Sequence, residues 1–156
     1  MSEAKRVAEG LLGRYDLTKP PFDPEFIAER EGVDVKFTSF SEEASSKVHG
    51  FYDHEDKTIY VNSEDSVQEK MFTIAHELGH HVLHQTYSAG AGYVPRLKTH
   101  VETKEELEAD SFAVSLLAPA KVVKQYASVF DDSELSSLFL VSPEVISGVK
   151  TSCDEI

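Results

Sequence analysis

The first third of the chain alternates between helical and extended patterns of hydrophobic and polar residues. Residues 1–13 space apolar side chains among charged ones, as one face of a short amphipathic helix requires. Asp23 followed by Pro24 is typical of a helix start, because the aspartate can cap the first turn and proline fits within it. Residues 24–31 are therefore predicted to be helical. Residues 33–37 carry an apolar side chain at every second position, which predicts a half-buried strand.

The middle of the chain predicts a hairpin followed by a long helix. Residues 48–52 and 58–62 are two further apolar stretches, and the short polar segment between them favours an antiparallel pair of strands. From residue 66 to about residue 84 the apolar positions recur with helical spacing. Residues 85–101 contain two glycines and a proline, and we interpret them as a loop.

The last third is predicted to be helical. Thr103 can cap a helix that runs to about residue 117, and the glutamates in its early turns suit the positive end of the helix dipole. Pro119 begins a further helix, and two short helices are expected at 133–140 and 143–151. The predicted fold class is α+β, with a small sheet of about three strands packed on a mainly helical domain.

Length and composition suit one ordinary globular domain spanning residues 1–156, in which residues from about 121 to 152 form a helical cap. Hydrophobic residues make up 40% of the chain and charged residues 28%, which argues against disorder. The single cysteine excludes an internal disulfide. We find no run of about 18 apolar residues and no apolar core of a signal peptide. We therefore expect a cytoplasmic protein without a membrane segment.

Charge narrows the choice of partner. The formal net charge is −13, and a surface this acidic repels the phosphate backbone of nucleic acids. Nucleic acid is therefore not expected as a direct ligand. A basic protein is a better partner, because opposite charges favour its approach.

The strongest chemical signal is the pentapeptide HELGH at residues 76–80. His76 and His80 are four residues apart, so both imidazoles fall on one helix face and can bind one ion at about 2 Å from each nitrogen. Glu77 points about a third of a turn away and can reach a water on that ion, whose proton it would accept as the catalytic base. The pattern predicts hydrolysis of a carbonyl compound assisted by zinc.

A catalytic zinc needs a third protein ligand, which must come from an element packed against the HELGH helix. The segment EELEAD at residues 105–110 offers several carboxylates. Glu106 and Asp110 are four residues apart, so Glu106 can bind the metal while Asp110 accepts a hydrogen bond from a ligating histidine. Glu106 is the predicted ligand, Glu108 is the runner-up, and Glu105 follows.

The segments KTIYVN, QEKMFTIAHELGHHVLH and EELEADSFAVSLLAP together resemble the ImmA/IrrE family of zinc metallopeptidases, which are gluzincins with a zincin-like fold. The resemblance covers roughly residues 45–120 and rests on two motifs in the right order at a compatible separation. It implies that His76, His80 and Glu106 hold one zinc ion per chain, with manganese as an alternative metal. It also implies that Glu77 is the catalytic base.

Two small departures from the family pattern leave the expected ligands untouched. Asp110 stands where the family often has asparagine, but both side chains accept hydrogen bonds, so we expect the support of the histidine to survive. Ala118 stands where methionine is common before the proline.

The resemblance implies an endopeptidase that acts on a cytoplasmic protein, in this family commonly a helix-turn-helix transcriptional repressor. Zinc would polarise a water, Glu77 would take its proton, and the peptide carbonyl would be attacked. The setting would be a stress response or the regulation of a phage or mobile element. The alternative is a zinc-containing binding protein without catalysis, which inactivates a repressor by sequestering it.

The donor that would stabilise the oxyanion is left open. Tyr87, Tyr93, Arg96 and His100 all lie in or near the expected loop between the two motif helices, and each is a candidate. His84, one turn beyond the pentapeptide, is expected to have a structural or solvent role.

Overall fold

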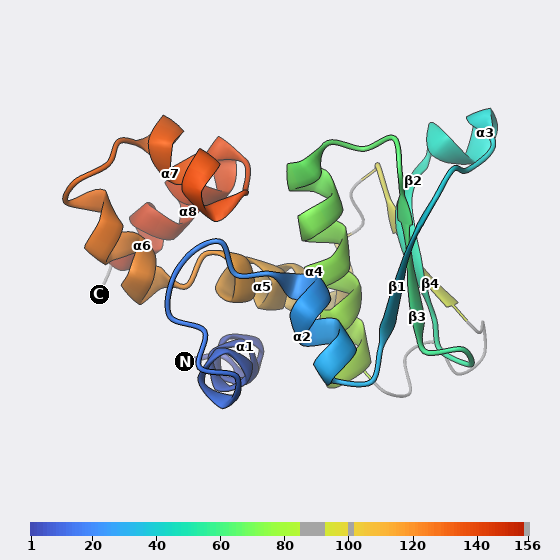
Figure 1. Ribbon diagram of the computed structural model, residues 1–156, viewed down its shortest axis with the longest axis horizontal. Coiled ribbons are helices and arrows are strands. Elements are labelled where there is room, and N and C mark those ends of the chain that lie inside the picture. The colour runs from blue at the N-terminus through green and yellow to red at the C-terminus, as the bar shows by residue number, and fades with distance from the viewer. Residues whose placement is uncertain (85–92, 100–101, 155–156) are drawn as a thin grey trace.

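The computed structural model describes residues 1–84, 93–99 and 102–154, in which a four-stranded mixed sheet packs against a helical layer (Figure 1). The strands are β1 (Asp34–Thr38), β2 (Val48–Asp53), β3 (Thr58–Asn62) and β4 (Tyr93–Leu97). The helices are α1 (Glu3–Arg14), α2 (Pro24–Arg30), α3 (Glu42–Ser45), α4 (Val67–Leu83), α5 (Lys104–Leu117), α6 (Ala120–Ala127), α7 (Asp132–Phe139) and α8 (Pro143–Asp154). The predicted α+β class is confirmed.

Local capping signals place the helix starts where the sequence predicted them. The Asp23 side chain accepts a hydrogen bond from the Glu25 backbone N–H, and the Thr103 hydroxyl accepts one from Glu106. The helix with the HELGH motif begins after Ser66, whose hydroxyl accepts from the Glu69 N–H. These bonds satisfy backbone donors that have no partner within the helix.

The sheet has the order β1-β3-β2-β4. The predicted hairpin of β2 and β3 is confirmed, and β1 lies parallel to β3. The interpretation of residues 85–101 as a loop was wrong for β4, which pairs antiparallel with β2 and makes a fourth strand. Glycines and Pro95 gave the segment a loop-like composition, but an edge strand tolerates a proline because one side of its backbone needs no partner.

Helix α4 lies between the sheet and α5, at the centre of the hydrophobic core (Figure 1). Ile74 and Leu78 of α4 are fully or almost fully buried, together with Val61 on β3 and Phe112 on α5. The remaining helices α6 to α8 gather at the far end from the sheet (Figure 1). In the described part of the chain, every helix is too short or too polar to traverse a lipid bilayer.

Gly50 on β2 faces α4 where the sheet and this helix come closest. A methyl group on Gly50 would collide with the backbone oxygen of Tyr60 and would lie 2.7 Å from Cγ2 of Thr73. The absence of a side chain at Gly50 therefore lets the sheet lie against the helix that carries the motif.

We expect Gly50→Ala to destabilise the protein by about 1–3 kcal/mol, because neighbouring backbone must shift to accept the methyl group. Denaturant unfolding followed by circular dichroism measures the change. Gly10→Ala on α1 is the matched control: nothing lies within 4 Å of the added methyl group, and alanine favours the helix by about 0.5–1 kcal/mol. Equal stability of the Gly50 variant and the wild type would contradict this account of the close approach.

Candidate metal centre

The two motif helices, α4 and α5, make the most extensive contact between any two elements of the described structure. Small residues allow this close approach. A methyl group on Gly79 would lie 3.0 Å from Cδ1 of Phe112, and Ala109 is fully buried. Because the helices lie so close, a side chain of α5 can reach between two side chains of α4.

His76, Glu106 and His80 meet at this contact. Nε2 of His76 lies 2.9 Å from Oε2 of Glu106, and Nε2 of His80 lies 2.9 Å from Oε1 of the same carboxylate. One candidate ligand atom from each of the three residues can be chosen so that all lie within 4.8 Å of one another. The residues that the sequence predicted as ligands are therefore brought together.

These three residues fit a zinc ion. Ligand atoms about 2.0–2.2 Å from a tetrahedral zinc are roughly 3.4 Å apart, and the spacing of the group is compatible with that. Two imidazoles and one carboxylate form a donor set typical of catalytic zinc sites, which keep a fourth position for water or substrate. Both histidines are buried, and their Nε2 atoms lie beside the Glu106 carboxylate, where a metal ion could bind all three side chains.

Asp110 supports His76 as predicted. Its Oδ1 atom lies 2.8 Å from Nδ1 of His76, on the opposite side of the ring from Glu106. The hydrogen bond requires a proton on Nδ1 when Asp110 accepts it, and that leaves Nε2 to face the centre of the group. Asp110 can thus hold the orientation of the ring and, when a metal takes Nε2, the proton on Nδ1.

Glu77 is fully buried beside the group, and within the described residues neither of its carboxylate oxygens makes a hydrogen bond with good geometry. The pKa of Glu77 is raised to about 8: burial raises it most and the charge of Glu106 adds to the rise, while His76, Arg96 and the Tyr52 backbone lower it. A buried carboxyl group without a firm partner is costly and calls for an explanation. A cation and a water beside it would supply one.

The protonation of the group is set by its mutual hydrogen bonds. Burial favours the neutral form of His76, but hydrogen bonds to Asp110 and Glu106 outweigh it and raise the pKa of His76 to about 9. Burial lowers the pKa of His80. Burial would raise the pKa of Glu106, but hydrogen bonds from both histidines dominate and lower it to about 2. In the metal-free protein, the positive charge of protonated His76 therefore balances the negative charge of Glu106, as a metal ion would.

Zinc binding at pH 7 is expected to release between one and two protons: His76 with a pKa of about 9 must lose a proton before its Nε2 can bind, and Glu77 with a pKa of about 8 must be ionised to serve as a base. The apparent affinity should then rise at least about tenfold per pH unit from pH 7 towards pH 8. Titration calorimetry in buffers with different heats of ionisation counts the protons. An observed heat that is the same in all buffers would contradict this prediction.

The runner-up metal ligand and the one candidate oxyanion donor that the structure describes lie outside the group of three. Oε2 of Glu108, the runner-up ligand, lies 3.8 Å from Nε2 of His84 rather than within the group of three. Of the oxyanion candidates, Tyr87 and His100 and the side chain of Tyr93 lie outside the described residues. The fourth, Arg96, is described and lies near Glu77.

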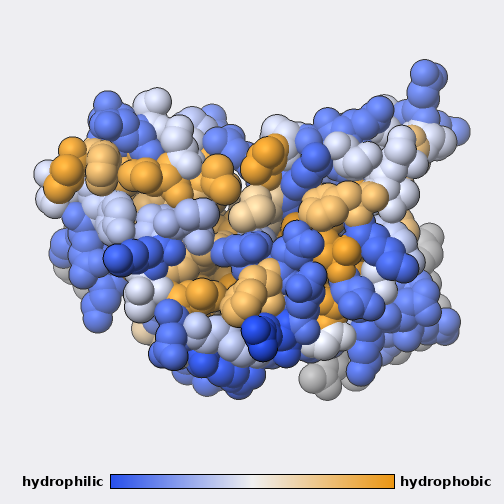
Figure 2. Space-filling model, in the orientation of Figure 1, coloured by the Kyte–Doolittle hydropathy of each residue, from blue (hydrophilic) through white to orange (hydrophobic). Residues whose placement is uncertain are grey.

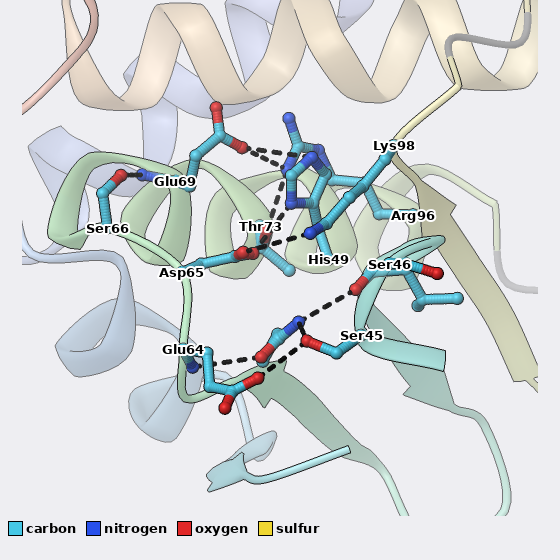
Figure 3. Close-up of polar contacts among 12 residues, drawn as sticks. Ser45, Ser46, His49, Glu64, Asp65, Ser66, Glu69, Thr73, Arg96 and Lys98 are labelled. Carbon is cyan, nitrogen blue, oxygen red and sulfur yellow. Dashed lines mark hydrogen bonds and ion pairs between the residues drawn. The ribbon is translucent and has the colours of Figure 1, made fainter. Parts of the chain in front are cut away.

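Arg96 is held in a polar network between β4 and α4 (Figure 3). Its guanidinium donates through the NH1 nitrogen to Oε2 of Glu69 and to Oγ1 of Thr73, 2.9 Å away in each case. The Cζ atom also lies 4.8 Å above the ring centre of Phe72. His49 joins the network through Glu69, at 3.4 Å from Oε2. Arg96 on β4 is therefore held beside the turn of α4 that precedes the HELGH motif, and it places a positive charge there.

A cleft of about 210 Å³ opens beside this network, between the first turns of α4 and the junction of α7 with α8. Figure 2 shows a hollow in the outline of the molecule at this junction. Phe72 and Arg96 line the cleft, and the Phe72 ring centre is 6.4 Å from that of His76. The cleft thus lies next to the metal group along α4.

Two residues near the site have contacts that the sequence did not predict. His84, which was expected to have a structural or solvent role, has its Nδ1 3.0 Å from Nδ1 of His80. The spacing of four residues between these histidines was the available signal, because it places them on one helix face. Arg96 was one of four equal candidates, and no local pattern could distinguish it because its position depends on the pairing of β4.

Comparisons with known proteins identify a family and a similar fold. A family model described as the IrrE N-terminal-like domain, Peptidase_M78, matches residues 28–147. The uncharacterized immunity region protein 2 of Bacillus phage phi105 is 39% identical over 82 residues, which are 51% of this chain and 51% of the phage protein. A Mycobacterium tuberculosis transcriptional regulator of known structure has a similar fold, with a TM-score of 0.64, 18% identity and coverage of 94% of this chain and 46% of that one.

The match spans about half the length of each of these two proteins, at 51% and 46%. The family match, in contrast, covers most of the chain and includes both motifs that carry the candidate ligands. The resemblance seen in the sequence is confirmed: the chain belongs to the Peptidase_M78 family of metallopeptidases, through its IrrE N-terminal-like domain.

Proposed function

We propose that this protein is a zinc-dependent endopeptidase that cleaves a cytoplasmic helix-turn-helix transcriptional repressor. The observation that carries the proposal is the meeting of His76, His80 and Glu106 beside a buried Glu77, whose carboxylate makes no well-aligned hydrogen bond with any residue that the structure describes. A donor set with an adjacent carboxyl group is the arrangement that metal-assisted peptide hydrolysis needs. Membership of a metallopeptidase family supports the same conclusion.

Each residue of the site has a role in this proposal. His76, His80 and Glu106 would hold one metal ion, with zinc expected and manganese compatible with the same donors. A bound zinc would supply Lewis acidity, which polarises a carbonyl and acidifies water. Glu77 would accept the proton of the attacking water and pass it to the leaving amine. Its pKa of about 8 lies close to neutral pH, where a group can both take and return a proton.

The cleft beside the site supports a polypeptide substrate. Its volume of about 210 Å³ can admit one side chain of an extended peptide, and its lining combines Phe72 with the fixed cation of Arg96. Successive residues of an extended chain are about 3.3 Å apart, so a side chain in the cleft places a neighbouring peptide bond near His76.

Two observations support a repressor as the substrate: the acidic net charge of this chain and its similarity to a phage immunity region protein. The formal net charge of −13 favours a basic partner, as a DNA-binding protein is, because complementary charges steer association. A relative is an immunity region protein of a phage, which suits a role in gene regulation. Selectivity would then come from docking of the whole substrate protein rather than from one deep side-chain pocket.

The test is cleavage of a candidate repressor by the zinc-loaded protein, followed by mass spectrometry of the products. We expect one main cut in a helix-turn-helix repressor from the same genome, loss of the cut when a chelator is present, and little cleavage of casein. Cleavage of casein at a similar rate would overturn the assignment of a selective peptidase. Absence of any cut with zinc bound would overturn peptide hydrolysis for that substrate and favour sequestration.

A further inference from the structure

Three histidines, His76, His80 and His84, follow one another at intervals of four residues, the first two on α4 and the third directly after its last residue. The ring centres are 4.9 Å apart for the first pair and 5.1 Å apart for the second. The first two belong to the candidate metal group, and the third has no assigned role in it. The side chain of His84 is only 9% exposed, so it belongs to the protein interior rather than to solvent.

His84 is bound to His80 at two points. Its backbone N–H donates to the His80 carbonyl over 2.9 Å, and its ring nitrogen Nδ1 lies 3.0 Å from Nδ1 of His80. His84 is also the residue that ends α4, where its backbone leaves the helical conformation. The end of the helix therefore turns this ring back onto the preceding turn and fixes it against His80.

The contact between two Nδ1 atoms limits where the protons can be. Only one proton fits between ring nitrogens 3.0 Å apart, so one ring donates and the other accepts. A neutral histidine that binds a metal through Nε2 carries its proton on Nδ1. With a metal on His80, therefore, His84 must be the acceptor, and its own proton must sit on Nε2.

The proton on Nε2 of His84 would point towards the carboxylate of Glu108. Oε2 of Glu108 lies 3.8 Å from this nitrogen, which is beyond hydrogen-bond length but close enough for electrostatic attraction. The attraction favours the tautomer of His84 that leaves Nδ1 free to accept from His80. Glu108 comes from α5, the same helix that supplies Glu106 and Asp110.

We propose that His84 is a positioning residue for the metal centre: it accepts a hydrogen bond from Nδ1 of His80, with Glu108 holding it in the required tautomer. The proposal rests on the proposed metal site. It gives His80 the same kind of support that Asp110 gives His76, since both ligand rings turn Nε2 towards Glu106 and Nδ1 towards a partner. Such partners typically change metal affinity by about 10–100-fold when they are removed.

The experiment measures zinc affinity of the full chain by competition with a chromophoric chelator at fixed pH. We expect His84→Ala to weaken binding about 10–100-fold, and His84→Asn to recover most of the loss, because the asparagine oxygen can take the place of Nδ1 as acceptor. Glu108→Gln should weaken binding only a few-fold, since its contact is electrostatic. His81→Ala is the matched control, because Nδ1 of His81 faces the Tyr52 hydroxyl instead, and it should stay within about twofold.

A spectroscopic measurement separates positioning from mere packing. Long-range proton–nitrogen NMR of the zinc-loaded wild type should show the His84 proton on Nε2, with Nδ1 of His84 unprotonated and accepting from Nδ1–H of His80. Circular dichroism of the metal-free variants checks that each of them folds, and Glu108→Gln changes a partly exposed residue whose replacement the fold should tolerate.

The outcomes separate this inference from the proposed function. Zinc uptake by the wild type with equal affinity in His84→Ala would overturn the role of His84 and leave the metal site standing. No gain from alanine to asparagine at position 84, or a His84 proton on Nδ1 in the zinc-loaded protein, would also overturn it. A wild type that takes up no zinc would overturn the proposed function and this inference together.

Discussion

Glu77→Gln is expected to lower the rate of substrate cleavage by about 10²–10⁴-fold while zinc remains bound. Glutamine keeps the size of the side chain but cannot accept a proton, and Glu77 is not a member of the group of three candidate ligands. The rate is measured by mass spectrometry of repressor fragments over time, and the metal content of the same samples by elemental analysis.

This variant also decides between catalysis and sequestration. A protein that acts by binding its repressor would still relieve repression in cells when Glu77 is replaced, whereas a peptidase would not. Because Glu77 is buried and its pKa is raised to about 8, the wild type already carries a largely neutral side chain at this position without metal. The amide should therefore disturb the fold little, and unfolding of the metal-free variant checks this. Full cleavage activity of Glu77→Gln would remove Glu77 from the mechanism.

Zinc is expected to raise the unfolding temperature of the wild type and to leave that of His80→Ala almost unchanged. At a free zinc concentration about 1,000 times the dissociation constant, binding stabilises the native state by about 4 kcal/mol. For a domain of this size that corresponds to a rise of roughly 8–16 °C. His80→Ala removes one of the three ligands, so the gain should disappear together with the bound zinc.

The comparison is made within each variant, with and without zinc, because loss of the buried His80 side chain can lower stability by itself. His81→Ala serves as the control, since it changes the neighbouring histidine of the same helix, and it should keep the full zinc-dependent rise. A similar rise in His80→Ala and in the wild type would show that zinc binds elsewhere on the chain.

Local signals in the sequence predicted most helices and the central hairpin. Asp23 and Thr103 cap helices as expected because capping involves a side chain and backbone only two or three residues apart. The strand β4 was missed for the opposite reason: residues 93–97 become a strand by pairing with β2, more than forty positions earlier in the chain, and nothing in their own composition requires it.

In the candidate site, too, the residues set by local spacing could be predicted from the sequence, and those set by packing could not. The spacing of His76 and His80 is enough to place two imidazoles on one helix face, so the metal chemistry and the base Glu77 could be predicted without the structure. The sequence also placed a cluster of acids on a second helix, but it left three glutamates as possible ligands, in ranked order.

Only the packing of α5 against α4 brings Glu106, rather than Glu108, between the two histidines. That packing depends on contacts such as Gly79 against Phe112, which join residues far apart in the chain. The role proposed for His84 likewise rests on tertiary contacts, since the ring meets His80 at the end of α4 and Glu108 across the helix contact. Residue types and short spacings determined the chemistry, and the tertiary structure decided which side chains share it, because distances between elements are set by packing and not by local sequence.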